Sequence, residues 1–390
     1  MVEERRDTCP ACEAAVPEVF YRAGPVPIHS VLLMPTREQA RSYPHGDIRL
    51  GLCRRCGFVT NTAFDATRLE YSAAYEETQA FSPTFNVFQR RLVEDLIERH
   101  DLRGKRVLEI GCGKGEFLTQ LCELGGNRGI GYDPSHVPER GSARADIEFV
   151  HELYGEHSGD GDADFVCCRM TLEHIQPAAS FLSMLRRALR SGSRATVFFQ
   201  VPDFEHILRD AAFWDIYYEH CSYFTRASLG RLFRRCGFAV TNVWSEYDDQ
   251  YLMIEAEPAV GSTDDGIDGI EKLASRVQQF STVSRATVQR WADALLQIDR
   301  AGRRVVVWGA GSKAVAFLGA VDAHEIVRYA VDINPHKQGT FLPGGGQEIV
   351  APSFLRDYCP QVVIVMNPVY RREIADDLAR LGLDCELLCL

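Results

Sequence analysis

Hydrophobic and polar positions between residues 104 and 257 alternate in a way that predicts a doubly wound α/β domain. Short runs of β-branched and aromatic residues recur, and stretches with helical periodicity separate them. The strands predicted from these runs are 106–110, 127–132, 146–150, 163–168 and 194–201. Strands that alternate with helices form a mostly parallel sheet with helices on both faces.

The same periodicity divides the rest of the chain. Apolar residues recur at helical spacing near Phe88 to Arg99, and again from Ile270 to about Asp299. Pro258 to Gly269 has the composition of a linker. A second strand-turn-helix begins at Arg304, and strands near 329–332 and 362–365 follow it. Two Rossmann-like units in tandem are therefore expected.

Composition narrows the class of protein. The 390 residues suffice for two or three domains, and 46% hydrophobic residues can build substantial cores. The net charge of −11 argues against broad nucleic-acid binding, which needs a basic face. No segment approaches the roughly 20 apolar residues of a membrane span, and the charged N-terminus lacks a signal-peptide pattern. We expect a cytoplasmic protein, monomeric or homodimeric, whose 13 cysteines are thiols or metal ligands.

A glycine-rich turn follows the first strand of the central domain. Residues 107–117 read VLEIGCGKGEF, so Glu109 precedes three alternating glycines, Gly111, Gly113 and Gly115. Glycines let the backbone turn sharply and approach a ligand. The turn lacks the Lys-Ser/Thr pair of a P-loop and the G-x-G-x-x-G spacing of a dinucleotide site. A ligand with a ribose and a cation but no phosphate fits, and S-adenosylmethionine (SAM) is such a ligand.

A second acid supports SAM. Asp133 stands at the end of the next predicted strand, where a carboxylate accepts both ribose hydroxyls. A structural turn in any doubly wound sheet, or an NAD site, is the alternative. Glu109, Gly111, Gly113 and Asp133 match the cofactor pattern of class I SAM-dependent methyltransferases, which the chain resembles here. The predicted cofactor-binding residues are Glu109, Gly111, Cys112, Gly113, Asp133 and Glu152.

Two C-x-x-C pairs lie near the N-terminus. Cys9, Cys12, Cys53 and Cys56 can place four thiolates around one ion, and four sulfurs favour a closed tetrahedral zinc site with a structural role. A redox C-x-x-C needs only one pair. Because 40 residues separate Cys12 from Cys53, a small subdomain must fold between the pairs. Cys167 and Cys168 lie in an apolar strand and are expected to pack.

The acceptor of the methyl group must be bound by other residues. Residues 214–224, WDIYYEHCSYF, follow the fifth predicted strand, at the sheet edge where such enzymes bind the acceptor. His174 follows the fourth strand, and Tyr71 and Tyr75 precede the first helix of the methyltransferase unit in a segment that can act as a lid. For each of these groups, an aromatic or histidine that only packs is the alternative.

These features together resemble one family. The four-Cys lobe, the SAM lobe with Glu-His-Ile after its fourth strand, the Tyr-Glu-His-x-x-Tyr-Phe loop and the second Rossmann-like lobe occur in zinc-containing deoxysugar C-methyltransferases. The resemblance spans nearly the whole chain and includes Gly309-x-Gly311-x-Lys313 and residues 332–339, DINPHKQG. It implies a zinc-binding lobe at 1–65, a SAM-binding methyltransferase domain at 66–257, a linker and long helix at 258–300, and a Rossmann-like domain at 301–390.

The resemblance also implies a reaction. Such enzymes methylate C-3 of nucleotide-linked 4-keto sugars, and their base is the histidine of the Tyr-Glu-His loop, which corresponds to His220. Histidine suits this step because its pKa lies near the operating pH. Donors must then stabilise the enolate oxygen. The predicted catalytic residues are His220, Glu219, Tyr218, His174, Tyr75 and Tyr71, and the predicted substrate contacts are Tyr223, Lys313 and Lys337.

One strand departs from the family. Where the family has a Gly-Gly-Ser-Leu-Arg-like strand, this chain has residues 247–254, YDDQYLMI. The lost arginine and the added Asp248 and Asp249 would disfavour a phosphorylated acceptor at that point. An O- or N-methyltransferase of another natural-product or cell-surface-sugar intermediate therefore stays open, as does a SAM- and zinc-binding assembly module without catalysis. The C-terminal lobe could bind NAD or contact a nucleotide-bearing substrate.

Overall fold

Three β-sheets organise the part of the chain that this computed structural model describes. The described residues are 8–14, 17–140, 144–159, 161–189, 194–259 and 269–390. The sheets contain four, seven and five strands and follow one another along the chain, apart from one short strand of the first sheet. The linker prediction at 258–269 falls almost entirely outside the described residues.

The central sheet has the order β10-β11-β8-β7-β4-β5-β6. Each predicted strand is present, with its ends shifted by at most two residues. The parallel strands are β4 (Arg106–Ile110), β5 (Arg128–Tyr132), β6 (Ile147–Val150), β7 (Phe165–Arg169) and β8 (Thr196–Pro202). The antiparallel hairpin of β10 (Phe238–Glu246) and β11 (Tyr251–Pro258) extends the sheet beyond β8.

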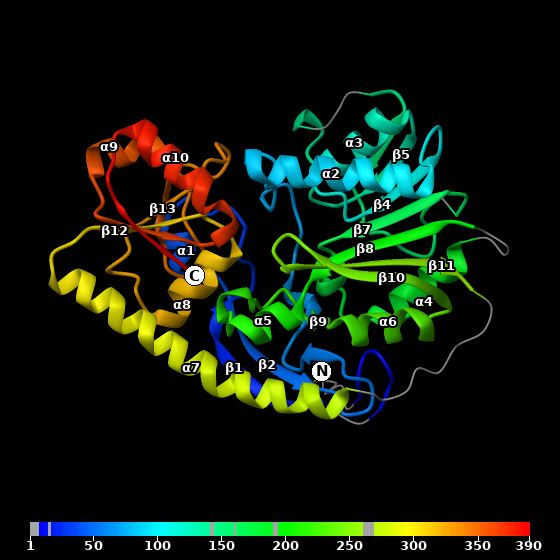
Figure 1. Cartoon of the computed structure of the whole chain (residues 1–390), viewed down its shortest axis with the longest axis horizontal. Coiled ribbons are helices and arrows are strands. Elements are labelled where there is room, and N and C mark those ends of the chain that lie inside the picture. The colour runs from blue at the N-terminus through cyan, green and yellow to red at the C-terminus, as the bar shows by residue number, and fades with distance from the viewer. Residues whose placement is uncertain (1–7, 15–16, 141–143, 160, 190–193, 260–268) are drawn as a thin grey trace.

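Helices bury both faces of this sheet. Successive residues of β4, Val107 and Leu108, belong to different cores, as the twofold periodicity of a strand requires. The helices α2 (Pro83–His100) and α3 (Glu116–Gly125) cover one face, and α4 (Ala178–Ala188) and α6 (Arg226–Arg235) cover the other (Figure 1). This arrangement confirms the doubly wound α/β fold. Helix α2 begins earlier than predicted because Ser82 caps it and Pro83 takes its first turn.

The C-terminal sheet repeats the same winding. Its order is β14-β13-β12-β15-β16 and every pair is parallel. The strands are β12 (Val305–Trp308), β13 (Tyr329–Val331), β14 (Glu348–Val350), β15 (Val362–Val365) and β16 (Glu386–Cys389). Its helices are α8 (Ser312–Val321), α9 (Leu355–Tyr358) and α10 (Arg371–Leu381). Strand order reverses at β12/β15 here and at β4/β7 in the central sheet, and such reversals open a crevice at the carboxyl ends of the strands.

The N-terminal sheet is completed by a strand from the central domain. It contains β1 (Glu18–Pro27), β2 (His45–Leu52), β3 (Val59–Asn61) and β9 (Ser222–Tyr223), all antiparallel, with α1 (Arg37–Arg41) between β1 and β2. Strand β9 directly follows the Tyr-Glu-His loop. The N-terminal lobe therefore holds that loop in place by main-chain hydrogen bonds.

A long helix links the lobes. Helix α7 (Ile270–Arg300) has 31 residues and is about 46 Å long at 1.5 Å per residue. Its first half packs on β1 and on α5 (Phe204–Asp210), and its second half packs on α8 (Figure 1). Short 3-10 turns complete the described structure: η1 (Ala66–Arg68), η2 (Pro138–Arg140), η3 (Leu172–His174), η4 (Phe213–Asp215), η5 (Pro352–Phe354) and η6 (Pro368–Tyr370).

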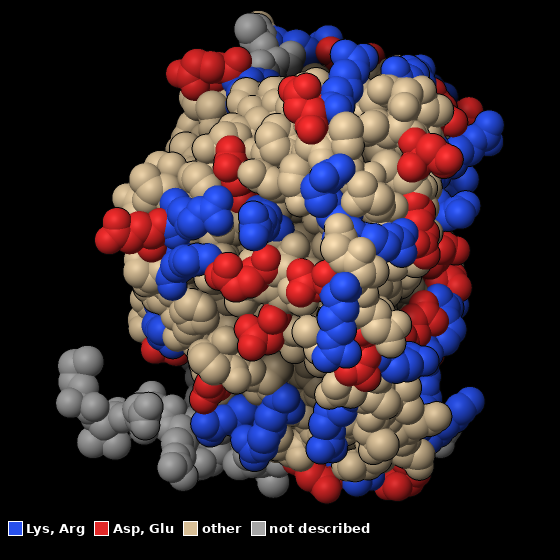
Figure 2. Space-filling model, turned by 90° about the vertical axis from the view of Figure 1, so that its left-hand side faces the viewer, with Lys and Arg blue, Asp and Glu red and all other residues tan. Residues whose placement is uncertain are grey.

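Charged side chains of both signs are interspersed over the face on which the C-terminal domain lies (Figure 2). Neither sign forms a continuous field there, which agrees with the modest acidic excess of the sequence. Within the described ranges, every helix is too short or too polar to cross a lipid bilayer.

Candidate active site

A cavity of about 760 Å³ lies where the three lobes meet. The carboxyl ends of β4, β5, β7 and β8 form one wall, and the turn after β12 forms another. Leu69, Tyr71, Tyr75 and residues 77–82 line it between these walls, and main-chain pairing of Leu32 with Tyr75 holds this segment to the N-terminal lobe. Both strand-order reversals open into this space, so the two Rossmann-like units share one cavity.

The glycine turn after β4 has the conformation that only glycine adopts easily. Gly111, Gly113 and Gly115 have φ values of 71°, 54° and 86°. A Cβ at Gly111 would lie 2.0 Å from Oγ1 of Thr171. The main-chain N–H of Gly113 donates to Oδ2 of Asp133 at 2.8 Å, so the acid at the end of β5 fixes the turn.

Five of the predicted cofactor residues line the cavity, namely Glu109, Gly111, Cys112, Gly113 and Asp133. Glu109 is almost fully buried, one of its oxygens has no hydrogen-bond partner within the described structure, and burial raises its pKa to about 8. A buried carboxylate without a partner is costly, and a ligand that brings a cation or a donor removes that cost. The turn, Asp133 and Glu109 therefore fit a SAM molecule.

Glu152 lies elsewhere. Its side chain is exposed and is not among the described residues that line the cavity, whereas its neighbours Leu153 and Tyr154 are. Lys114 is a cavity residue that no sequence pattern singled out. Its ammonium donates to the carbonyl oxygens of Tyr75 and Ser135 at 2.8 and 2.7 Å, and thereby links the segment above the cavity to the residues next to the glycine turn.

An aromatic and histidine cluster occupies the cavity beyond the glycine turn. The hydroxyl of Tyr71 and Nδ1 of His174 are 2.9 Å apart. The ring centroids of His174 and His220 are 4.8 Å apart with nearly perpendicular planes, and the ring of Tyr217 contacts His220 at 4.7 Å. Burial lowers the pKa of His174 and holds the pKa of His220 well below its usual value. Both imidazoles are therefore neutral near pH 7 and can accept a proton.

Glu219 is turned away from this cluster. Its carboxylate accepts hydrogen bonds from Ser30 and, at 3.2 Å, from the hydroxyl of Tyr75. Nδ1 of His29 lies 3.0 Å from it. Because Nε2 of His29 accepts from the N–H of Glu70, Nδ1 carries the proton and donates to Glu219. Burial alone would raise the pKa of Glu219, but the hydrogen bonds from His29 and Ser30, together with the nearby His174, lower it to about 2. Glu219 positions the loop between His29 and His220, and it is absent from the described cavity lining.

Tyr217, and not Tyr218, faces the cavity. The ring of Tyr218 packs in a separate cluster with Phe64, and its hydroxyl accepts from the N–H of Asp65 at 3.1 Å. Tyr217 lines the cavity and donates to Oδ1 of Asp215 at 2.9 Å. Neighbours in an extended loop point to opposite sides, so Tyr217 and Tyr218 could not both reach the same space. The sequence therefore indicated that only one of the two tyrosines faces the cavity, but it did not show which one.

Of the three predicted substrate contacts, Tyr223 lies outside the described cavity lining, and Lys313 and Lys337 are part of it. Tyr223 is buried in β9, where its hydroxyl donates to the carbonyl of Tyr217, and the described cavity lining does not include it. Lys313 and Lys337 do line the cavity. The ammonium of Lys313 lies 2.5 and 2.6 Å from the two oxygens of Asp215, and that of Lys337 donates to the carbonyl of Ala310 at 3.1 Å.

The strand that departs from the family forms a tight turn. Tyr247, Asp248 and Asp249 all have positive φ and make the β10–β11 turn, and Asp249 forms an ion pair with Arg209 outside the described cavity lining. Gln250 does line the cavity, and its amide exchanges two hydrogen bonds with Asn367 of the C-terminal domain. The two aspartates are therefore exposed and lie outside the described cavity lining.

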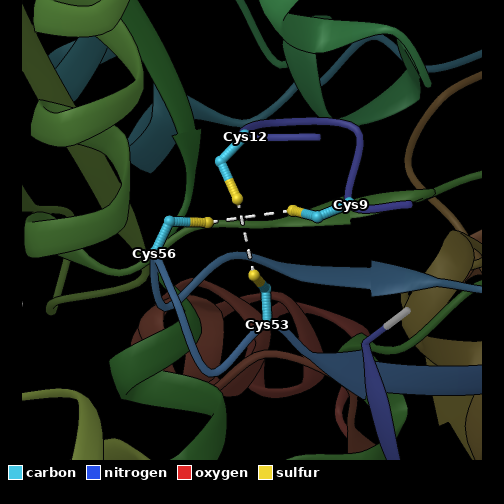
Figure 3. A group of neighbouring side chains, drawn as sticks. All are labelled: Cys9, Cys12, Cys53 and Cys56. Atoms are coloured by element: carbon cyan, nitrogen blue, oxygen red, sulfur yellow. Dashed lines mark hydrogen bonds between the residues drawn. The ribbon is translucent and has the colours of Figure 1, made fainter. Parts of the chain in front are cut away.

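The four N-terminal cysteines converge on one point (Figure 3). Their sulfurs all lie within 4.8 Å of one another, with Cys9–Cys56 at 3.8 Å and Cys12–Cys53 at 3.6 Å. All four are buried. Cys9 and Cys12 precede β1 and Cys53 and Cys56 lie between β2 and β3, so the residues between the pairs fold into strands β1 and β2 and helix α1. The set of four thiols fits a tetrahedral thiolate-binding metal.

Comparisons with known proteins give further information. A family model described as a methyltransferase domain matches residues 85–243, and one described as a C-methyltransferase C-terminal domain matches residues 265–383. The C-methyltransferase NovU of Streptomyces niveus is 27% identical over 347 residues, which is 84% of this chain and 81% of that protein.

Other similarities are confined to parts of the chain. The ubiquinone biosynthesis O-methyltransferase of Aromatoleum aromaticum is 30% identical over 138 residues, which is 32% of this chain and 55% of that protein. Among solved structures, the 1,6-didemethyltoxoflavin-N1-methyltransferase of Burkholderia thailandensis, with bound S-adenosylhomocysteine, has a TM-score of 0.36 and 18% identity. It covers 44% of this chain and 79% of that protein.

Proposed function

Because this chain is a SAM-dependent methyltransferase, we propose that it transfers the methyl group to a carbon beside a ketone. The leading acceptor is a nucleotide-linked 4-keto-deoxysugar, methylated at C-3 in the cytoplasm. The similarity to C-methyltransferase NovU over 84% of the chain carries the proposal, because a match of that length extends well beyond the central domain. The match of residues 265–383 to a C-methyltransferase C-terminal domain supports it.

A carbon beside a ketone needs a base before it can attack a methyl group. His220 is the base that we assign, because it is neutral, buried in the cavity wall and near the carboxyl ends of β7 and β8. The acceptor C–H bond breaks, its proton bonds to a ring nitrogen of His220, and its electron pair forms the enolate. A positioned base of this kind contributes roughly 10²–10⁴-fold to the rate.

The remaining roles follow from position. The Tyr71–His174 pair supplies donors to the enolate oxygen, and Tyr217 bounds the acceptor beside His220. Tyr75 and Glu219 hold the loop that presents His220. The enolate carbon takes the methyl group from the SAM sulfonium in line, and the neutral thioether of S-adenosylhomocysteine (SAH) leaves.

The donor side uses the glycine turn. Glu109, Asp133 and the main chain of Gly111 to Gly113 would bind SAM, and Cys112 lies in the same wall. On the acceptor side, Lys313 and Lys337 would contact the nucleotide part of the acceptor from the C-terminal domain. To do so, Lys313 would leave Asp215, and Lys337 would leave the carbonyl of Ala310.

Zinc is proposed at the four-cysteine site, where Cys9, Cys12, Cys53 and Cys56 would bind it. A closed four-thiolate site cross-links the chain and leaves no position for catalysis. Because the lobe's sheet includes β9, the metal would stabilise the segment next to His220.

Methylation of oxygen or nitrogen is the second candidate, which the 30% identity to a ubiquinone biosynthesis O-methyltransferase over 138 residues favours. Solvent exchange separates the two reactions. The enzyme, SAH and thymidine diphosphate-4-keto-6-deoxyglucose are incubated in D₂O, and mass spectrometry follows deuterium at the carbon beside the ketone.

We expect enzyme-dependent deuterium uptake with SAH, and gain of one methyl group when SAM replaces SAH. Both should be lost in His220→Ala, which should still bind SAH by calorimetry. Methyl transfer to oxygen or nitrogen of a screened acceptor, without any carbon exchange, would contradict carbon methylation.

A further inference from the structure

Glu173 is a buried acid in the cavity wall to which the proposed reaction assigns no role. It lies in η3, directly before His174, and its exposed fraction is 0%. Neither of its carboxylate oxygens has a hydrogen-bond partner in the described structure. Burial raises its pKa to about 8, so leaving it unpaired is costly for folding. Such a group in an active-site wall calls for a functional explanation.

The main chain fixes Glu173 beside the His220 loop. The N–H of Cys221 donates to the carbonyl of Glu173 at 2.9 Å, which joins η3 to the residue that follows His220. One carboxylate oxygen of Glu173 and one ring nitrogen each of His174 and His220 all lie within 4.8 Å of one another. Rotation of the carboxylate or a bridging water spans that distance, and such contacts often tighten only when ligands bind.

Elimination leaves His220 as the partner of Glu173. His174 already contacts Tyr71, and Glu219 is held by His29. Nδ1 of His220, like the carboxylate, is buried and has no hydrogen-bond partner among the described atoms. The other titratable groups that face His220 have partners of their own: Tyr217 and Lys313 bond to Asp215, and Tyr223 bonds to the carbonyl of Tyr217.

We infer that Glu173 is the positioning residue of the base: its carboxylate accepts the Nδ1–H of His220, so that the lone pair on Nε2 faces the acceptor. This inference rests on the proposed function for its catalytic consequence. An imidazole has one N–H when neutral, and a carboxylate on Nδ1 selects the tautomer whose Nε2 can accept a proton. When the acceptor proton bonds to Nε2, the imidazolium lies beside the negative charge of Glu173.

The bound methyl donor contributes to this arrangement. Glu109 and Glu173 lie in the same wall, and the SAM sulfonium is a cation in that cavity. An opposite charge favours the ionised form of a carboxylic acid. A bound SAM molecule would therefore favour the carboxylate form of Glu173, which is the form that accepts the Nδ1–H of His220.

The direct test is the tautomer of His220 in the SAH complex and, separately, in the complex with the SAM analogue sinefungin, whose amine is cationic. Nitrogen-15 NMR of histidine-labelled protein reports which ring nitrogen carries the proton, and His220→Asn assigns the signal. We expect Nδ1–H in the wild type. In Glu173→Gln the amide can donate to Nδ1, so we expect the Nε2–H tautomer and a His220 pKa lower by at least about one unit.

Asp203→Asn is the matched control. Asp203 is also a buried acid of the cavity wall whose pKa burial raises, but its carboxylate accepts from Ser245 and from the N–H of Glu205. Its replacement should leave the tautomer and titration of His220 unchanged. Should Glu173→Gln not fold, Glu173→Asp gives the same comparison with a shortened carboxylate.

An identical His220 signal and titration in wild type and Glu173→Gln would overturn the inference. A divalent metal ion that wild type retains and Glu173→Gln loses would overturn it as well, because the carboxylate would then be a ligand. Since the NMR experiment uses no acceptor, it is independent of the proposed function. If the His220 tautomer changes in Glu173→Gln but no keto sugar exchanges deuterium, the proposed function is wrong and the Glu173–His220 pairing is supported. If deuterium exchanges but the His220 signal is the same in wild type and Glu173→Gln, only the Glu173–His220 pairing is wrong.

Discussion

Replacement of Gly111 by alanine tests the assignment of the SAM site most sharply. Gly111 has a φ of 71°, and a left-handed backbone costs a residue with a Cβ about 1–2 kcal/mol. The new Cβ would lie 2.0 Å from Oγ1 and 2.7 Å from Cγ2 of Thr171. Thr171 cannot yield freely, because its hydroxyl donates to the carbonyl of Arg169 at 2.9 Å.

The two effects set the magnitude. Overpacking of this kind costs roughly 1–3 kcal/mol, so strain and clash together cost about 2–5 kcal/mol. Relief requires the turn to leave the shape that binds the cofactor, and about 1.4 kcal/mol corresponds to a tenfold change in affinity. We therefore expect SAH to bind at least about 30-fold more weakly to Gly111→Ala than to the wild type, measured by isothermal titration calorimetry.

Gly126→Ala is the control. Gly126 has a similar φ of 61° at the end of α3, but no atom lies within 4 Å of the position that a Cβ would take there. This variant should lose about 1–2 kcal/mol of stability in urea unfolding and bind SAH normally. If Gly111→Ala binds SAH as tightly as Gly126→Ala does, the glycine turn is not the SAM site as described.

Three further predictions concern other parts of the molecule. Elemental analysis should find one zinc ion per chain. The Cys53→Ser variant should lose this zinc ion and have a lower thermal midpoint of unfolding. Full zinc content in Cys53→Ser would contradict the four-thiolate site. The pKa of Glu219 is lowered from 4.5 to about 2. The resulting contribution to the free energy of unfolding, about 3 kcal/mol, is present above pH 4.5 and is lost as pH falls towards 2. Wild type should therefore exceed Glu219→Gln in thermal midpoint at pH 7, and the gap should close below pH 4.5; a gap that does not change with pH would refute the assignment. Tyr217→Phe should lower kcat, because a ring that no longer bonds to Asp215 loses its fixed contact with His220. Tyr218→Phe should instead reduce the free energy of unfolding by about 1 kcal/mol, because the hydrogen bond to Asp65 is lost. Equal effects of both variants on kcat would contradict the inward placement of Tyr217.

Local patterns in the sequence determined the elements and the donor half of the site. A strand buried on both faces, a glycine that must adopt positive φ and an acid at the end of the next strand are short-range features, so residues 106–133 predicted their own fold and ligand. The four cysteines were equally legible, because metal-ligand spacing is local within each pair. The 31-residue helix α7 also followed from its periodicity.

The acceptor half was decided by contacts between residues far apart in the chain. Glu219 was predicted beside the base, but His29, 190 residues away, turns it out of the cavity. Tyr217 replaced Tyr218 because Phe64 and Asp65 of the N-terminal lobe take the second ring. Asp248 and Asp249 are exposed in the β10–β11 turn, whereas the next residue, Gln250, lines the cavity and pairs with Asn367 of the C-terminal domain. Side-chain direction in an irregular loop depends on the partners that burial makes available, and only the tertiary structure brings those partners together.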